Sequence, residues 1–162
     1  VISISLRKRV KPKLNFNLKL VKLKREKPEF KNLKYKKILS YLSKMDNSKS
    51  DIALVSNKKI LETGTSNLLF VKNQKFFTPK KDYYEGNTYK FFKTKIKRIG
   101  KKDILLKELN DYDEILLIGS GKGVTSVRTI NELNWKRKNL NKFKFLSNQY
   151  NVAINECDTY RF

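Results

Sequence analysis

The sequence predicts an α+β fold, and three observations lead to this prediction. Apolar residues alternate with Asn and Lys from Leu14 to Leu20, a two-residue period that is typical of a half-buried strand. Between Ile38 and Met45 the apolar spacing changes to steps of three and four, which indicates a helix. Hydrophobic residues make up 39% and aromatic residues 12% of the 162 residues, enough to build one globular core.

Composition excludes several classes of site. The chain has no histidine and a single cysteine, Cys157, which excludes an internal disulfide, zinc sites, Ser-His triads and histidine acid–base chemistry. No metal site is expected. No apolar run approaches the roughly 18 residues of a membrane span, and no signal peptide is visible, so we expect a cytoplasmic protein with no membrane contact. The chain begins with Val1 inside a strand-like segment, as a fragment or a protein without a preceding domain would.

The net charge of +23 leaves two interpretations open. Lys and Arg clustered on one face would indicate nucleic-acid binding. Here the lysines are spread from end to end and accompany frequent Asn, Phe, Tyr and Ile, a mixture typical of an AT-rich genome. Nucleic-acid binding stays open as an alternative but is not favoured.

The other elements follow from periodicity and turn residues. Asn57-Lys58 and Asn73-Gln74 are hairpin turns, Thr78-Pro79 ends a strand, and Arg25 is expected on a solvated basic face with its lysine neighbours. The predicted strands cover residues 1–6, 14–20, 51–56, 60–63, 68–71, 76–77, 96–99, 115–118 and 124–127. The predicted helices are one of about ten residues ending at Asp46, a short one after Gly86, one at 105–109 and a closing one at 140–150.

The stretch from Lys58 to Pro79 is the most informative part of the chain. Glu62 ends one strand and is followed directly by a small-residue corner, Thr63 to Ser66. A carboxylate in this position can be aimed into a pocket beside free backbone N–H groups. The simpler alternative is a β-meander with an ordinary polar corner, because Gly and Ser are common turn residues.

Three ordered motifs resemble those of the class IV, pyridoxal-phosphate-dependent aminotransferases. Glu62 begins the first, E-x-G-x-x-N-L-x-F, which is followed by F-x-T-P ending at Pro79. The second is Gly86-Asn87-Thr88-Tyr89, which is similar to the family's Gly-x-Thr-Arg, and the third is the D-E-hydrophobic-G-S strand from Asp113 to Ser120. Tyr89 stands where the family usually has Arg, and whether this abolishes activity stays open.

The resemblance implies a fold and an organisation. The fold would be a mixed β-sheet or pseudo-barrel with flanking helices, like that of D-amino-acid aminotransferases. Residues 1–162 would form a single cofactor-binding domain similar to the C-terminal domain of the family, with the smaller N-terminal domain mostly absent. Arg7 or Arg9 would be a remnant of the phosphate-binding Arg of that smaller domain. The resemblance also implies a homodimer that acts on a small amino substrate.

The resemblance assigns roles to individual residues. Lys34, six residues after Pro28 and preceded by Leu33, would form the Schiff base with pyridoxal 5′-phosphate, and Lys31 is the alternative register. Glu62 would face the pyridine nitrogen and Tyr35 the 3′ oxygen of the cofactor.

The same resemblance gives the phosphate a cradle of two segments. Asn87 and Thr88 would offer backbone N–H groups at a helix start, together with the loop formed by Gly119, Ser120 and Gly121. This glycine-rich loop lacks the spacing of a Walker motif, so a nucleotide-binding loop is rejected.

Within the family the compact spacing from Lys34 to Glu62 is most similar to aminodeoxychorismate lyase. The expected reaction is conversion of 4-amino-4-deoxychorismate to p-aminobenzoate and pyruvate, a step of folate biosynthesis. Two alternatives remain: a branched-chain or D-amino-acid aminotransferase of class IV, and a non-catalytic basic domain that binds nucleic acid or a partner.

Overall fold

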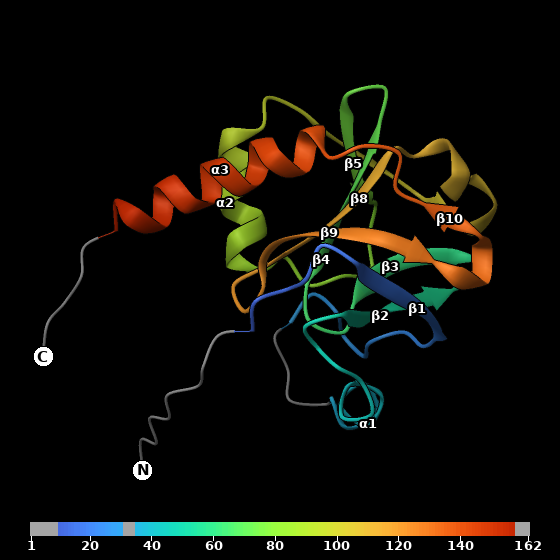
Figure 1. Ribbon diagram of the computed structural model, residues 1–162. Helices are drawn as coiled ribbons and strands as arrows, with labels where there is room; N and C mark the ends of the chain where they lie inside the picture. The colour runs from blue at the N-terminus through green and yellow to red at the C-terminus, as the bar shows by residue number, and fades with distance from the viewer. Residues whose placement is uncertain (1–9, 31–34, 158–162) are drawn as a thin grey trace, which may run out of the picture.

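The computed structural model describes residues 10–30 and 35–157 (Figure 1). Strands are the most common regular element of the described residues. The strands are β1 (Phe16–Lys22), β2 (Ser50–Ser56), β3 (Lys59–Thr63), β4 (Asn67–Lys72), β5 (Lys75–Pro79), β6 (Ile99–Lys102), β7 (Ile104–Leu105), β8 (Glu114–Gly119), β9 (Gly123–Ile130) and β10 (Trp135–Lys136). The helices are α1 (Lys36–Leu42), α2 (Asn87–Lys95) and α3 (Asn141–Asn155), with 3₁₀ turns η1 (Leu106–Asp111) and η2 (Asn131–Leu133).

The strands join into one mixed sheet in the order β6-β5-β4-β8-β9-β1-β2-β3-β7, with β10 added on β9. The pairs β1–β2, β1–β9 and β5–β6 are parallel, and the other pairs are antiparallel. The sheet has two halves, one with β1, β2, β3 and β7 and the other with β4, β5, β6 and β8, and β9 joins them. The first residues of β9 pair with β8, whereas Val127 and Thr129 pair with β1 across a register shift. The predicted α+β class and mixed sheet are confirmed.

The main core lies between the two halves of the sheet. Phe16 and Ala53 from one half meet Phe70 and Leu117 from the other in a single cluster of fully buried residues. The sheet therefore curls around this cluster, as the predicted pseudo-barrel requires. Trp135 closes the cluster, and its indole N–H donates to the carbonyl of Tyr112.

Two further clusters attach the helices. Helices α2 and α3 lie side by side over the outer face of β4 and β8, where Phe92 and Leu146 are both buried (Figure 1). Helix α1 packs separately on β2 through Ile38 and Leu42. None of the described helices is both long and apolar enough to cross a membrane.

The two predicted hairpin turns are confirmed. Asn57 and Lys58 have φ of 49° and 60°, and Asn73 and Gln74 have φ of 49° and 63°. A turn of two consecutive residues with a left-handed backbone conformation matches the right-handed twist of the flanking strands. These turns fix the register of β2–β3 and β4–β5.

Several predicted boundaries were wrong. Helix α1 ends at Leu42 rather than Asp46. After Ser43 the backbone continues in tighter turns, in which the N–H groups of Lys44 and Met45 donate to the carbonyls three residues earlier. The strand predicted at 96–99 begins only at Ile99, as β6. The N–H of Ile96 still donates to the carbonyl of Phe92 at the end of α2. The helix predicted at 105–109 is the 3₁₀ turn η1. The strand predicted at 1–6 lies outside the described residues.

Candidate active site

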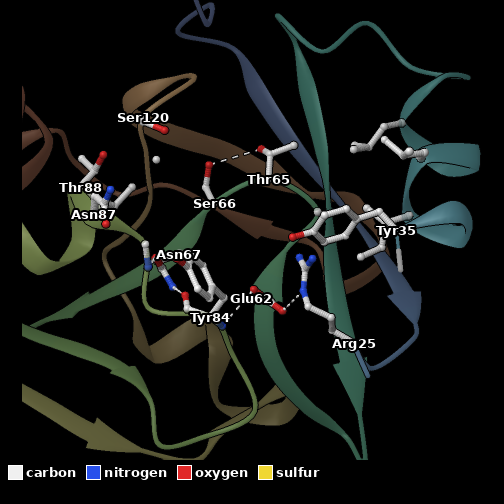
Figure 2. A pocket seen from close by; sticks show the side chains of 17 residues that line it. Arg25, Tyr35, Glu62, Thr65, Ser66, Asn67, Tyr84, Asn87, Thr88 and Ser120 are labelled. Atoms are coloured by element: carbon white, nitrogen blue, oxygen red, sulfur yellow. Dashed lines mark hydrogen bonds and ion pairs between the residues drawn. The ribbon is translucent and has the colours of Figure 1, made fainter. Parts of the chain in front are cut away.

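A cavity of about 290 Å³ opens where four parts of the chain meet α1 (Figure 2). These parts are the end of β3, the corner between β3 and β4, the start of α2 and the end of β8. The cavity wall contains Glu62 and Arg25 on one side and Asn87, Thr88 and Ser120 on the other. One side thus carries a carboxylate with its arginine partner, and the other carries the first turn of α2 and a serine.

Glu62 and Arg25 form a buried ion pair. The Arg25 Nε lies 2.7 Å from the Glu62 Oε1, and the two side chains are only 6% and 4% exposed. Burial raises the pKa of Glu62 above its usual range, while the charge and hydrogen bond of Arg25 act in the opposite direction. Arg25 therefore favours the ionised carboxylate inside the cavity. The prediction that Arg25 lies on a solvated face was wrong, because this acidic partner draws its side chain inward.

Tyr35 covers the pair from the side of α1. Its ring lines the cavity, and the Arg25 guanidinium lies 4.6 Å from the ring centroid (Figure 2). A cation stacked on an aromatic face is held in place and partly shielded from water. Tyr35 therefore lies at the cavity, where the resemblance places it. The candidate amines Lys34 and Lys31, like Arg7 and Arg9, lie outside the described residues.

Asn67 connects the corner to the start of α2. Its side-chain amide donates to the carbonyl of Tyr84, and its Oδ1 accepts the N–H of Gly86 at 3.0 Å. The N–H of Tyr84 in turn reaches Glu62 Oε2 at 3.4 Å. The segment before α2 is therefore fixed to the strand that carries the carboxylate. Sequence reasoning gave Asn67 only as a motif residue, without this role.

The opposite side of the cavity presents the start of α2 and the end of β8. Asn87 and Thr88 line it in the first turn of α2, where backbone N–H groups have no partner within the helix. Gly119 and Ser120 line it from the end of β8. A Cβ on Gly119 would lie 2.5 Å from the Ser66 Oγ, so only glycine allows this close approach.

Two residues singled out in the sequence lie elsewhere. Gly121 borders a neighbouring hollow beside α1 rather than the cavity. Tyr89 is 1% exposed and packs edge-on against Tyr83 in the core beneath α2. The residue at the family's Arg position therefore contributes to packing and offers no charge to the cavity.

Comparison with known families decides the relationship. The model of the class IV aminotransferases matches residues 5–130, most of the chain. The chain belongs to the class IV aminotransferase family. None of the curated proteins matches it significantly.

Solved class IV structures share the fold. The branched-chain aminotransferase of Thermoproteus uzoniensis, solved with norvaline, has a TM-score of 0.74 and 16% identity over 88% of this chain and 52% of its own. The PLP form of the branched-chain aminotransferase of Thermobaculum terrenum has a TM-score of 0.74 and 17% sequence identity. The match covers 89% of this chain and 52% of that protein. A putative 4-amino-4-deoxychorismate lyase from Legionella pneumophila has a TM-score of 0.68 and 18% sequence identity. The match covers 91% of this chain and 59% of that protein. The chain thus spans between 52% and 59% of the length of these proteins.

The cavity residues fit pyridoxal 5′-phosphate, the cofactor of this family. A buried carboxylate, Glu62, is suited to a protonated ring nitrogen, and Tyr35 offers a phenol to the ring. The first turn of α2 and Ser120 supply donors for a phosphate across the cavity. The sequence motifs predicted these residues, but they could not predict Arg25.

Proposed function

We propose that this chain is the cofactor-binding domain of a pyridoxal-phosphate-dependent lyase. The reaction would convert 4-amino-4-deoxychorismate to p-aminobenzoate and pyruvate in the cytoplasm, with a homodimer as the working unit. The observation that carries the proposal is a buried, Arg-paired carboxylate facing a helix N-terminus across one cavity.

When bound, pyridoxal phosphate supplies an electron-withdrawing ring that stabilises negative charge at the substrate Cα. Glu62 would accept a hydrogen bond from the ring nitrogen, and Arg25 would keep Glu62 ionised for this role. Asn87, Thr88 and Ser120 would bind the phosphate. Lys34, with Lys31 as the alternative, would hold the cofactor covalently and move the Cα proton.

A single-substrate assay tests the lyase. Protein loaded with pyridoxal phosphate should release p-aminobenzoate and pyruvate in equal amounts from 4-amino-4-deoxychorismate with no keto acid added. In Glu62→Gln we expect kcat to fall by about two orders of magnitude or more, which corresponds to about 3 kcal/mol of transition-state stabilisation. Glu108→Gln, on η1 and not among the residues that line the cavity, serves as the control and should keep the wild-type rate.

A class IV aminotransferase is the second candidate, because branched-chain aminotransferases and aminodeoxychorismate lyases share this fold. A transaminase needs an acceptor, because its cofactor is left as the amine after one half-reaction. Sustained amino transfer to 2-oxoglutarate, without p-aminobenzoate, would reject the lyase and establish this alternative.

A further inference from the structure

A second buried ion pair lies behind the side of the cavity that Gly119 and Ser120 line. The Lys122 Nζ is 2.9 Å from the Asp51 Oδ2, and the side chains are 6% and 0% exposed. Lys122 belongs to the turn between β8 and β9, two residues after Ser120, whereas Asp51 lies in β2, 71 residues away in sequence. The reaction described above uses neither residue.

Asp51 is the centre of a fully bonded network. Its Oδ1 accepts the N–H of Ile52 at 2.8 Å, and its Oδ2 accepts the hydroxyls of Thr65 and Thr63 in addition to Lys122. Thr63 Oγ1 also accepts the N–H of Ser66 at 2.8 Å. The carboxylate therefore ties the corner between β3 and β4 to the lysine of the β8–β9 turn.

The β8–β9 turn needs such an anchor. A Cβ on Gly121 would find nothing within 4 Å, and Gly123 has a left-handed φ of 66°. Glycines of this kind have high conformational freedom, and a turn without packing opens easily. The side chain of Lys122 extends from this turn into the core. Its Nζ lies 5.1 Å from the centroid of the Phe16 ring.

The corner and the turn also touch at the cavity itself. Gly119 packs so closely on Ser66 that a Cβ would meet the Ser66 Oγ at 2.5 Å and the Thr65 carbonyl at 3.3 Å. Thr65, Ser66, Gly119 and Ser120 all line the cavity. The ion pair thus lies immediately behind two segments that form one wall.

Stability alone is a weak reason for this pair. A buried ion pair costs desolvation free energy, and apolar side chains of similar volume often stabilise a protein as well or better. What the pair supplies is a defined geometry, because charge and hydrogen bonds fix two segments that packing alone would leave free to shift.

We propose that Lys122 and Asp51 are positioning residues that anchor the Gly119–Gly123 turn against the Thr63–Ser66 corner. This anchor holds Gly119 and Ser120 where they can bind the phosphate of the cofactor. The assignment to a phosphate rests on the function proposed above.

The test compares the double variant Asp51→Asn/Lys122→Met with the wild-type protein. The double variant leaves no buried charge unpaired, so it should fold. The matched control is Asp111→Asn/Lys72→Met, which removes an exposed ion pair of the same 2.9 Å length. The first measurement is amide hydrogen exchange of peptides covering the Gly119–Gly123 turn. We expect exchange there to be about tenfold faster in the double variant, with the strands β4 and β5 unchanged.

The second measurement is the ratio of the Kd of pyridoxal to the Kd of pyridoxal 5′-phosphate. A role limited to folding would weaken both ligands alike, whereas the proposed anchor affects only the phosphate. We expect the ratio to fall about tenfold in the double variant and to stay unchanged in the control.

Unchanged exchange in the turn, or an unchanged ratio, would overturn the proposal. Hydrogen exchange is measured without the cofactor, so the anchoring role and the proposed function can be refuted independently. A wild-type protein that binds no pyridoxal phosphate would refute the proposed function, and faster exchange in the double variant would still support the anchor.

Discussion

Replacing Arg25 by Met should make the stability of the protein strongly dependent on pH. The substitution keeps most of the side-chain volume but leaves the Glu62 carboxylate buried without its cation. Among residues 10–30 and 35–157, Glu62 then keeps only the weak contact from the Tyr84 N–H at 3.4 Å. The cofactor-free protein must either bear an unpaired buried charge or bind a proton on Glu62.

The size of the effect follows from the geometry. The contact is 2.7 Å long, but the Arg charge is spread over the guanidinium, so an effective separation of about 4 Å at a dielectric constant of about 20 gives about 4 kcal/mol. This agrees with the roughly 3–5 kcal/mol that is lost when one partner of a buried pair is removed. We therefore expect Arg25→Met to lower the free energy of unfolding by about 4 kcal/mol at neutral pH.

The sign of the pH dependence comes from Glu62. Burial raises its pKa in the folded state, so the unfolded chain loses the proton first as pH rises, and stability falls through the folded pKa. Without Arg25 the folded pKa rises further. Urea unfolding at about pH 5 and about pH 8 should therefore show a larger loss at the higher pH.

Removing both partners should recover much of the lost stability. In Arg25→Met/Glu62→Gln we expect a coupling free energy of more than about 2 kcal/mol relative to the sum of the single variants. Lys72→Met, at an exposed ion pair, should change stability by less than about 1 kcal/mol. Single-variant losses that add without coupling, or a loss independent of pH, would refute this account of the pair.

Two other predictions concern buried groups outside the cavity. The Glu114 carboxylate is fully buried and accepts the N–H groups of Lys142 and Phe143 at the start of α3, at 2.7 and 2.9 Å. Glu114→Ala should lower the free energy of unfolding by about 1–3 kcal/mol, and Glu156→Ala at the other end of α3 should change it little; equal losses would contradict the capping role. Burial raises the pKa of Tyr89 to about 12, so the unfolded state releases this proton first and stability should decline between about pH 10 and about pH 12. Thermal unfolding at several pH values should show a smaller decline in Tyr89→Phe than in the wild-type protein. An equal pH dependence of the two proteins would refute the role of Tyr89.

Local patterns in the sequence predicted most of the strands and turns. The alternation around β1 and the Asn57-Lys58 turn depend only on neighbouring residues, so both could be predicted without knowledge of the rest of the chain. The end of α1 was missed, because the helical apolar spacing continues to Met45 while the backbone after Ser43 changes to hydrogen bonds over three residues.

The ion pairs in and behind the cavity wall are not local. Arg25 meets Glu62 37 residues later, and Asp51 meets Lys122 71 residues later. In a chain so rich in lysine, neither Arg25 nor Lys122 differs visibly from its solvated neighbours. The motif around Glu62 predicted the acidic member of the first pair, but the basic partners follow only from the way the sheet closes.

The most direct test of the central claim is to locate the amine that holds the cofactor. The protein is incubated with pyridoxal 5′-phosphate and reduced with borohydride, and the modified peptide is then identified by mass spectrometry. We predict modification of Lys34 at one equivalent per chain. Modification of Lys31 would correct the register by three residues, whereas the absence of a specific adduct would contradict the assignment of this cavity to pyridoxal phosphate.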